Sequence, residues 1–263
     1  MPESPAPDDG ADGLRDGEWD GVTRPVFLHA HPDDETLATG ALLTWLVDHG
    51  VRVAVVTATR GEQGEVVPGP LSALAGTPEL VAHRERELAG ALGVLGVSDH
   101  AFLGEPPALA AGREPRGYTD SGMRWLDAAE TLAGPGESAG PDSLTAAPVD
   151  EAAADLAAFL AAFGADALVS YDRHGGYGHP DHVACHRIAT AAARLSGVPL
   201  LEVVSEPLLP ARDAREYALP QYLDRVRAAL GHHASQLTVD GDEVVHVGGQ
   251  RQPILTTFWL RRP

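Results

Sequence analysis

Cysteine and positive charge are both scarce in this chain of 263 residues. Cys185 is the single cysteine, so no intramolecular disulfide can form, which fits the reducing cytoplasm. With 38 acidic and 19 basic side chains, the formal net charge is -19. Proteins that bind nucleic acid or an anionic membrane surface usually present a basic face, so we expect neither partner.

Long apolar runs are missing too. No stretch of about 18 uncharged apolar residues occurs, so no transmembrane helix is predicted. The opening segment, MPESPAPDDGADGLRDGEWDG, has neither a basic region nor an apolar run, and we do not expect it to be a secretory signal. We predict a disordered acidic tail over residues 1–24 and a single domain over residues 25–263, a length ample for a hydrophobic core.

Short apolar runs alternate with segments of helical spacing along the chain. Strands are predicted at 24–30 (RPVFLHA), 51–59 (VRVAVVTAT), 100–104 (HAFLG), 165–172 (ADALVSYD) and 198–206 (VPLLEVVSE). Helices are predicted at 32–49, 78–93, 150–163, 181–195 and 221–233. Residues 105–149 are expected to be irregular. The alternation predicts an α/β fold: a Rossmann-like, mostly parallel sheet flanked by helices, with a small β-rich C-terminal part.

Two segments repeat a His-Pro-Asp pattern: AHPDDE at 30–35 and GHPDH at 178–182. Each follows a predicted strand and begins a predicted helix, and ligands of open α/β sheets bind beyond the carboxyl ends of the strands. Pro32 and Pro180 suit the first position of a helix, and acids near its positive end are favourable. Helix capping is therefore the plainer interpretation, but the repetition favours a shared site.

The spacing within both segments is that of metal ligands. Residues three apart share a helix face, so His31 can converge with Asp34, and His179 with His182. A catalytic Zn²⁺ takes three protein ligands and leaves one open position. Two ligands from one segment and one from the other would suffice, and Asp33 could then act as a base. Spacing alone leaves open which histidine of the second segment binds the metal and which stabilises an oxyanion.

Several other interpretations are weaker. His31 and Asp33 with a distant histidine also match the site of Fe(II) oxygenases, but that site is common in all-β folds and disagrees with the βαβ pattern. His232 and His233 are adjacent, cannot share a helix face, and are expected at the surface. Cys185 is expected to be a small core residue.

Together, AHPDDE and GHPDH resemble the motifs of the PIG-L (LmbE-like) family of zinc-dependent N-acetylglucosaminyl deacetylases. Three stretches resemble one branch, the deacetylases of mycothiol biosynthesis that act on N-acetylglucosaminyl-inositol: TRGEQGEV (59–66), YTDSGM (118–123) and YDRHGGYGHPDH (171–182). The likeness runs from about residue 26 to 205. It is weak in 124–149 and after about 206, where HHASQ (232–236) is faintly similar.

The resemblance implies a role for each matching residue. It implies a Zn²⁺ site, with Fe²⁺ as the alternative metal, whose ligands are His31, Asp34 and His182. It implies a catalytic set in which Asp33 is the general base, His179 assists the oxyanion or leaving amine, Asp181 orients His179, and Tyr177 polarises the acetyl carbonyl. It implies sugar and inositol contacts from Glu65, Arg84 and Asp120. Without it, these three would be interpreted as a loop residue, a solvated helix position and a turn residue.

The sequence thus predicts a cytoplasmic zinc hydrolase that acts on a small amino-sugar substrate. Within the hydrolases, the alternatives are the amidase that cleaves mycothiol S-conjugates and a deacetylase of another N-acetylglucosaminyl natural product. From a different class, the chain could be a non-catalytic, metal-dependent sugar-binding module. The presence of Asp33 speaks against that module, because a binding protein needs no base.

Overall fold

Strand β1 (Pro25–His29) is the third strand of a seven-stranded sheet with the order β3-β2-β1-β6-β7-β12-β8. This computed structural model describes residues 19–127, 132–205 and 213–263. The other strands of the sheet are β2 (Ala54–Thr57), β3 (Asp99–Phe102), β6 (Ala167–Tyr171), β7 (Leu200–Val203), β8 (Arg215–Ala218) and β12 (Thr257–Arg261). The pairings among β3, β2, β1, β6 and β7 are parallel, whereas β12 pairs antiparallel with β7 and β8. The predicted α/β fold with a mostly parallel sheet is confirmed.

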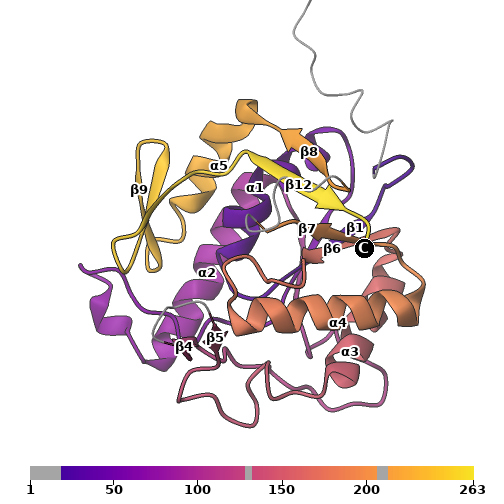
Figure 1. Ribbon diagram of the computed structural model, residues 1–263, viewed down its shortest axis with the longest axis horizontal. Helices are drawn as coiled ribbons and strands as arrows, with labels where there is room; N and C mark the ends of the chain where they lie inside the picture. The colour runs from indigo at the N-terminus through magenta and orange to yellow at the C-terminus, as the bar shows by residue number, and fades with distance from the viewer. Residues whose placement is uncertain (1–18, 128–131, 206–212) are drawn as a thin grey trace, which may run out of the picture.

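Helices cover both faces of this sheet (Figure 1). On one side lie α1 (Asp34–Asp48), α2 (Pro78–Leu95) and α5 (Leu223–Leu230), and on the other α3 (Val149–Phe163) and α4 (Pro180–Ser196). Successive side chains of a strand point to opposite faces. Accordingly, Phe27 of β1 packs in the first layer, while Val26 and Leu28 pack in the second. Cys185 is fully buried in the second layer, as predicted.

The C-terminal part is divided between two sheets. Strands β9 (Leu237–Asp240), β10 (Glu243–His246) and β11 (Arg251–Pro253) form a small antiparallel sheet, as expected of a β-rich end. Strand β12, in contrast, joins the main sheet, where Phe258 and Leu260 are buried. A second segment also differs from the prediction: within 105–149, the described residues include the short pair β4 (Arg124–Trp125) and β5 (Ala133–Gly134).

Two predicted boundaries differ from the structure. The predicted tail covers residues 1–24; residues 1–18 lie outside the described part of the chain, whereas Trp19 is buried in the core. Pro180 begins α4, as expected, but α1 begins at Asp34, so Pro32 lies before the helix. Within the described ranges, no helix is both long enough and apolar enough to cross a membrane.

The topology brings the two His-Pro-Asp segments together. The first follows β1, the second follows β6, and β1 and β6 are neighbouring parallel strands. Their carboxyl ends therefore share one edge of the sheet, at the first helical turns of α1 and α4.

Candidate metal centre

Three side chains of the two segments meet at one carboxylate oxygen. Oδ2 of Asp34 lies 3.2 Å from Nδ1 of His31 and 3.2 Å from Nε2 of His182. All three residues are buried, with exposed fractions of 8%, 7% and 3% in that order. The predicted convergence of His31, Asp34 and His182 is therefore observed.

Neighbouring groups orient both imidazole rings toward Asp34. Nδ1 of His182 donates to the carbonyl oxygen of Gly175 at 3.2 Å, and Nε2 of this buried ring has no hydrogen-bond partner among the described residues. Nε2 of His31 lies 3.2 Å from Oδ2 of Asp181 and can donate to it. In each ring, the nitrogen opposite the one that faces Asp34 has an acceptor. This is the outer-shell arrangement of metal-binding histidines.

Two of the three separations among these ligand atoms fit a small tetrahedral cation. With Zn–N and Zn–O bonds of about 2.0–2.2 Å, ligand atoms lie about 3.3 Å apart, close to the two separations of 3.2 Å. In two groups of side chains, ligand atoms all lie within 4.8 Å of one another: one comprises His31, His179 and His182, the other His31, Asp120 and Asp181. We favour the Asp34 set because it combines two imidazole nitrogens with a carboxylate, which supplies a negative charge.

The charges of the cluster suit a cation. Burial alone would raise the pKa of Asp34, but the rings of His182 and His31 hold it well below its usual value, so the carboxylate stays ionised. Burial alone would lower the pKa of His31, yet the carboxylates of Asp120, Asp181 and Asp34 raise it well above its usual value. A cation would replace the proton that these carboxylates attract.

Asp33 does not cap the helix that it precedes. It occupies the N-cap position of α1 with φ 125° and ψ -30°, and its side chain makes no capping hydrogen bond. Its carboxylate lies 3.5 Å from Nη2 of Arg84. Burial, reinforced by the charge of Asp34, raises the pKa of Asp33 to about 6, although Arg84 opposes the rise. Capping therefore does not explain this acid.

His179 and Tyr177 lie beside the ligand rings. The ring centroid of His179 is 4.7 Å from that of His31 and 5.1 Å from that of His182. Burial, reinforced by these two histidines, lowers the pKa of His179 to about 3, so its ring is neutral. Tyr177 is 63% exposed, and its ring centroid lies 6.0 Å from that of His179 and 5.2 Å from that of His182.

The predicted pairing of Asp181 with His179 differs from the structure. Oδ2 of Asp181 accepts from the backbone N–H of Ser121 at 2.8 Å and contacts His31 at 3.2 Å. His179 is contacted by the backbone of Asp181 instead, since Nδ1 of His179 accepts from the Asp181 N–H at 3.2 Å. The proton of the neutral His179 ring is thereby placed on Nε2. Asp181 is at helix position N2, where its carboxylate reaches across to the other segment.

The three predicted sugar contacts lie in different environments. Asp120 is buried, with Oδ1 3.5 Å from Nε2 of His31. Glu65 lies on an exposed loop. Arg84 is only 3% exposed, so the alternative of a solvated helix face is wrong; Nη1 donates to the carbonyl of Gly61 at 2.7 Å and Nη2 to that of Pro32 at 2.6 Å.

The prediction from sequence missed several supporting residues. The ring of Tyr171 stacks on His182 with centroids 4.3 Å apart, and its hydroxyl accepts from the Ala30 N–H at 3.1 Å. The carboxylate of Asp172 accepts from the backbone N–H of Gly175, and the carbonyl oxygen of Gly175 accepts from Nδ1 of His182. Gly175 has φ 65°, and a Cβ there would lie 2.8 Å from the nitrogen of Val183, so only glycine fits. Tyr171, Asp172, Gly175 and His182 all lie in the stretch YDRHGGYGHPDH (171–182), so the family resemblance of this stretch could have indicated them.

His233 is the clearest error of the sequence prediction. It was expected at the surface, but it is fully buried, while His232 is exposed. Nε2 of His233 lies 3.0 Å from Oε1 of Glu35, which is also fully buried. Burial alone would lower the pKa of His233, but Glu35 raises it. The faint family likeness of HHASQ (232–236) is the one feature of the sequence that indicates a role for His233. The argument that adjacent histidines cannot share a helix face does not apply, because α5 ends at Leu230 and both histidines follow it.

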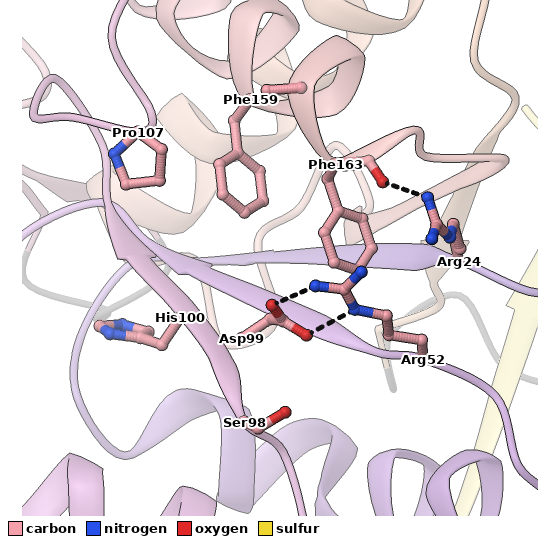
Figure 2. A pocket seen from close by; sticks show the side chains of 9 residues that line it. Arg24, Arg52, Ser98, Asp99, His100, Pro107, Phe159 and Phe163 are labelled. Atoms are coloured by element: carbon pink, nitrogen blue, oxygen red, sulfur yellow. Dashed lines mark hydrogen bonds and ion pairs between the residues drawn. The ribbon is translucent and has the colours of Figure 1, made fainter.

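A surface cavity of about 320 Å³ lies at the opposite edge of the sheet, beside residues at the amino ends of β1, β2 and β3 (Figure 2). Its arginines are engaged: Arg52 pairs with Asp99 through two hydrogen bonds of 2.8 and 2.9 Å, and Arg24 donates to the carbonyl of Phe163 at 3.0 Å. None of the predicted site residues lines this cavity.

The chain resembles named proteins by sequence. Residues 26–193 match the PIG-L family, described as GlcNAc-PI de-N-acetylase. A relative from Kineococcus radiotolerans, named 1D-myo-inositol 2-acetamido-2-deoxy-alpha-D-glucopyranoside deacetylase, is 44% identical over 66% of this chain and 45% of its own length. Relatives of the same name are 43% identical in Streptomyces scabiei (67% of this chain, 50% of the relative) and 34% identical in Streptomyces griseus (89% and 81%). The matched part thus spans about half the length of the first two relatives.

Solved structures share the fold at lower identity. The zinc-inhibited form of teicoplanin deacetylase Orf2 has a TM-score of 0.59 at 19% identity, covering 92% of this chain and 99% of that one. N,N'-diacetylchitobiose deacetylase from Pyrococcus horikoshii has a TM-score of 0.56 at 18% identity, covering 89% and 81%. Because the match over residues 26–193 covers more than half of the 263 residues and includes both His-Pro-Asp segments, this chain belongs to the PIG-L family.

Proposed function

We propose that this protein is a zinc-dependent deacetylase that removes the acetyl group from the N-acetylglucosamine unit of a small molecule. The observation that carries the proposal is Oδ2 of Asp34, which lies 3.2 Å from a ring nitrogen of His31 and 3.2 Å from one of His182. These three residues are the proposed ligands. The single cysteine supports the cytoplasm as its compartment.

The proposed chemistry assigns one task to each neighbouring side chain. When bound, Zn²⁺ would polarise the amide carbonyl and lower the pKa of a water molecule. Asp33 accepts a proton from the attacking water and returns it to the departing amine; a pKa of about 6 suits both steps near neutral pH. His179 donates from Nε2 to the developing oxyanion, and the hydroxyl of Tyr177 donates to the acetyl carbonyl. Asp181 holds the ring of His31.

The proposed substrate is N-acetylglucosaminyl-inositol. The names of the relatives from Kineococcus radiotolerans and Streptomyces griseus support this aglycone. Asp120 borders the ligand cluster, and Glu65 lies on the loop whose residue Gln63 donates from its N–H to Asp120 at 3.2 Å. Carboxylates accept hydrogen bonds from sugar and inositol hydroxyls, so a polyol aglycone would satisfy both.

Metal analysis of the purified protein, followed by acetate release from a small panel, tests the proposal. The panel comprises N-acetylglucosaminyl-inositol, free N-acetylglucosamine and a mycothiol S-conjugate. We expect one equivalent of Zn²⁺ and the highest kcat/KM for the first substrate. Fe²⁺ in its place would change the metal assignment, since two imidazoles and a carboxylate suit both ions. Sugar binding without acetate release would assign the chain to the non-catalytic class instead.

Variants at the two carboxylates test the aglycone. Asp120→Ala and Glu65→Ala should lower kcat/KM for the inositol substrate more than for free N-acetylglucosamine, because only the former has the additional hydroxyls. Equal losses on both substrates would contradict the inositol assignment and favour a broader sugar deacetylase.

A further inference from the structure

One peptide unit beside the proposed base is held from both sides. The carbonyl oxygen of Pro32 accepts from Nη2 of Arg84 at 2.6 Å. The N–H of Asp33, which belongs to the same planar peptide, donates to Oε2 of Glu35 at 2.9 Å. Both side chains that hydrogen-bond to this peptide are buried, with exposed fractions of 3% for Arg84 and 0% for Glu35. The orientation of this peptide is therefore set by two charged side chains rather than by solvent.

Glu35 is itself fixed by further partners. Oε1 accepts from the hydroxyl of Thr36 and lies 3.0 Å from Nε2 of His233, and both of these residues are fully buried. His233 lies 198 positions from Glu35 and beyond residues 26–193, the range of the family match. An ordinary helix-start contact needs no such support, because a surface carboxylate can accept a local N–H unaided.

The held peptide precedes a strained residue. Among the described residues, Asp33 is the one non-glycine with positive φ, at 125°. Such backbone conformations cost about 1–3 kcal/mol and persist where the surroundings enforce them, commonly at functional sites. With a relaxed, negative φ, the side chain of Asp33 would leave Cα in another direction. The direction of the carboxylate therefore depends on the orientation of the peptide.

We propose that Glu35, backed by His233, and Arg84 are positioning residues that hold the Pro32–Asp33 peptide and thereby aim the Asp33 carboxylate at the reacting water. The catalytic part of this inference rests on the proposed function; the conformational part does not. It gives Arg84 a role in the architecture of the site, in place of the predicted sugar contact.

Crystal structures of Glu35→Ala and His233→Leu test the conformational part without any substrate. We expect φ of Asp33 to become negative in Glu35→Ala, with His31, Asp34 and His182 unmoved. A structure of Glu35→Ala in which Asp33 keeps φ near 125° would overturn the inference.

Kinetics test the catalytic part. Misplacement of a group by about 1 Å can cost about 10²-fold in rate, so we expect Glu35→Ala and His233→Leu to lower kcat by about 10–100-fold. The metal content should remain stoichiometric, and KM should change by less than about threefold, because neither side chain touches the substrate. Glu35→Gln keeps an acceptor for the Asp33 N–H, and His233→Gln keeps a donor for Glu35. Both should stay within about tenfold of wild type.

A matched control separates positioning from general stability. Glu87 is another buried carboxylate that accepts from a backbone N–H and a hydroxyl, both of Ser235, at 2.7 and 2.6 Å. Glu87→Gln should lower the midpoint of thermal unfolding comparably to Glu35→Gln but leave kcat unchanged.

Besides an unchanged φ of Asp33 in Glu35→Ala, three results would overturn the proposal. They are loss of metal from Glu35→Ala, an unchanged kcat in both Glu35→Ala and His233→Leu, and failure of His233→Gln to restore the rate. If wild type releases no acetate from any substrate, the proposed function is wrong, and the crystal structures alone decide the inference.

Discussion

The two His-Pro-Asp segments are identical in three residues but begin their helices differently. In the second, His179 is the N-cap, with φ -56° and ψ 131°, and Pro180 is the first residue of α4. In the first, α1 begins at Asp34, and Asp33 takes the N-cap position with φ 125°. The same tripeptide therefore lies two residues further from the helix in the first segment than in the second.

This shift gives the two equivalent acids different partners. Asp181 lies inside the first turn of α4, and its carboxylate contacts His31 of the other segment at 3.2 Å. Asp33 lies outside α1, and its carboxylate is near Arg84. The backbone hydrogen bonds to Glu35 and Arg84 distinguish the first segment. A shared motif thus places similar residues near one site, while the surrounding side chains decide what each residue contacts.

Removing a proposed metal ligand should have the largest effect on activity, and the loss should be the same whichever segment the ligand comes from. Asp34→Ala in the first segment and His182→Ala in the second should each abolish stoichiometric metal binding and activity, because one carboxylate joins both rings. Metal analysis by mass spectrometry and acetate release provide the readouts. Full metal content in either variant would show that the ligands are assigned wrongly.

Replacing the equivalent acids, Asp33 and Asp181, by asparagine should have different effects in the two segments. Asp33→Asn should retain the metal and lose about 10²–10⁴-fold in kcat, since it removes the base while preserving size. Asp181→Asn should cost about 10–100-fold in metal affinity or activity, as expected for a residue that supports a ligand. Titration with Zn²⁺ and steady-state kinetics measure both. A larger loss of kcat in Asp181→Asn than in Asp33→Asn would reverse the two roles.

The pH dependence of the rate should be set by the acid of the first segment rather than the histidine of the second. Asp33 works ionised and its pKa is raised to about 6, so kcat/KM should rise with pH and reach half its plateau at or below about 6, because a bound cation lowers the pKa of a nearby carboxylate. The pKa of His179 is about 3, so its ring is neutral throughout this range. His179→Gln should lower the rate without moving the midpoint. A midpoint above 7 in wild type, or one that moves in the variant, would contradict this assignment.

The smallest effect is expected at the proline of the second segment. Pro180 occupies the first helical position, where its fixed φ suits the helix and its missing N–H is not needed. Pro180→Ala should therefore destabilise the protein by about 0.4–1 kcal/mol, through the greater freedom of the unfolded chain. Urea unfolding measures this loss, and metal content and kcat should be unchanged. A loss of metal would mean that the ring itself holds the site.

Much of the architecture and the location of the site follow from the sequence alone. Apolar runs alternating with helical spacing determine a parallel sheet covered on both faces, because each strand must bury both sides. The position of each His-Pro-Asp segment after a strand then places both at the same sheet edge. His31 and Asp34 lie close together because they are only three residues apart, although His31 precedes α1 and the two do not share a helix face.

Only the tertiary structure decided which atoms each acid contacts, because those contacts join residues far apart in the chain. Asp181 reaches His31 over 150 positions, and His233 reaches Glu35 over 198. The positive φ of Asp33 depends on such contacts, since no local preference of an aspartate enforces it. The sequence by itself therefore determined the fold and the neighbourhood of the site. The packing of distant segments decided the burial of His233, the partner of Asp181 and the direction of Asp33.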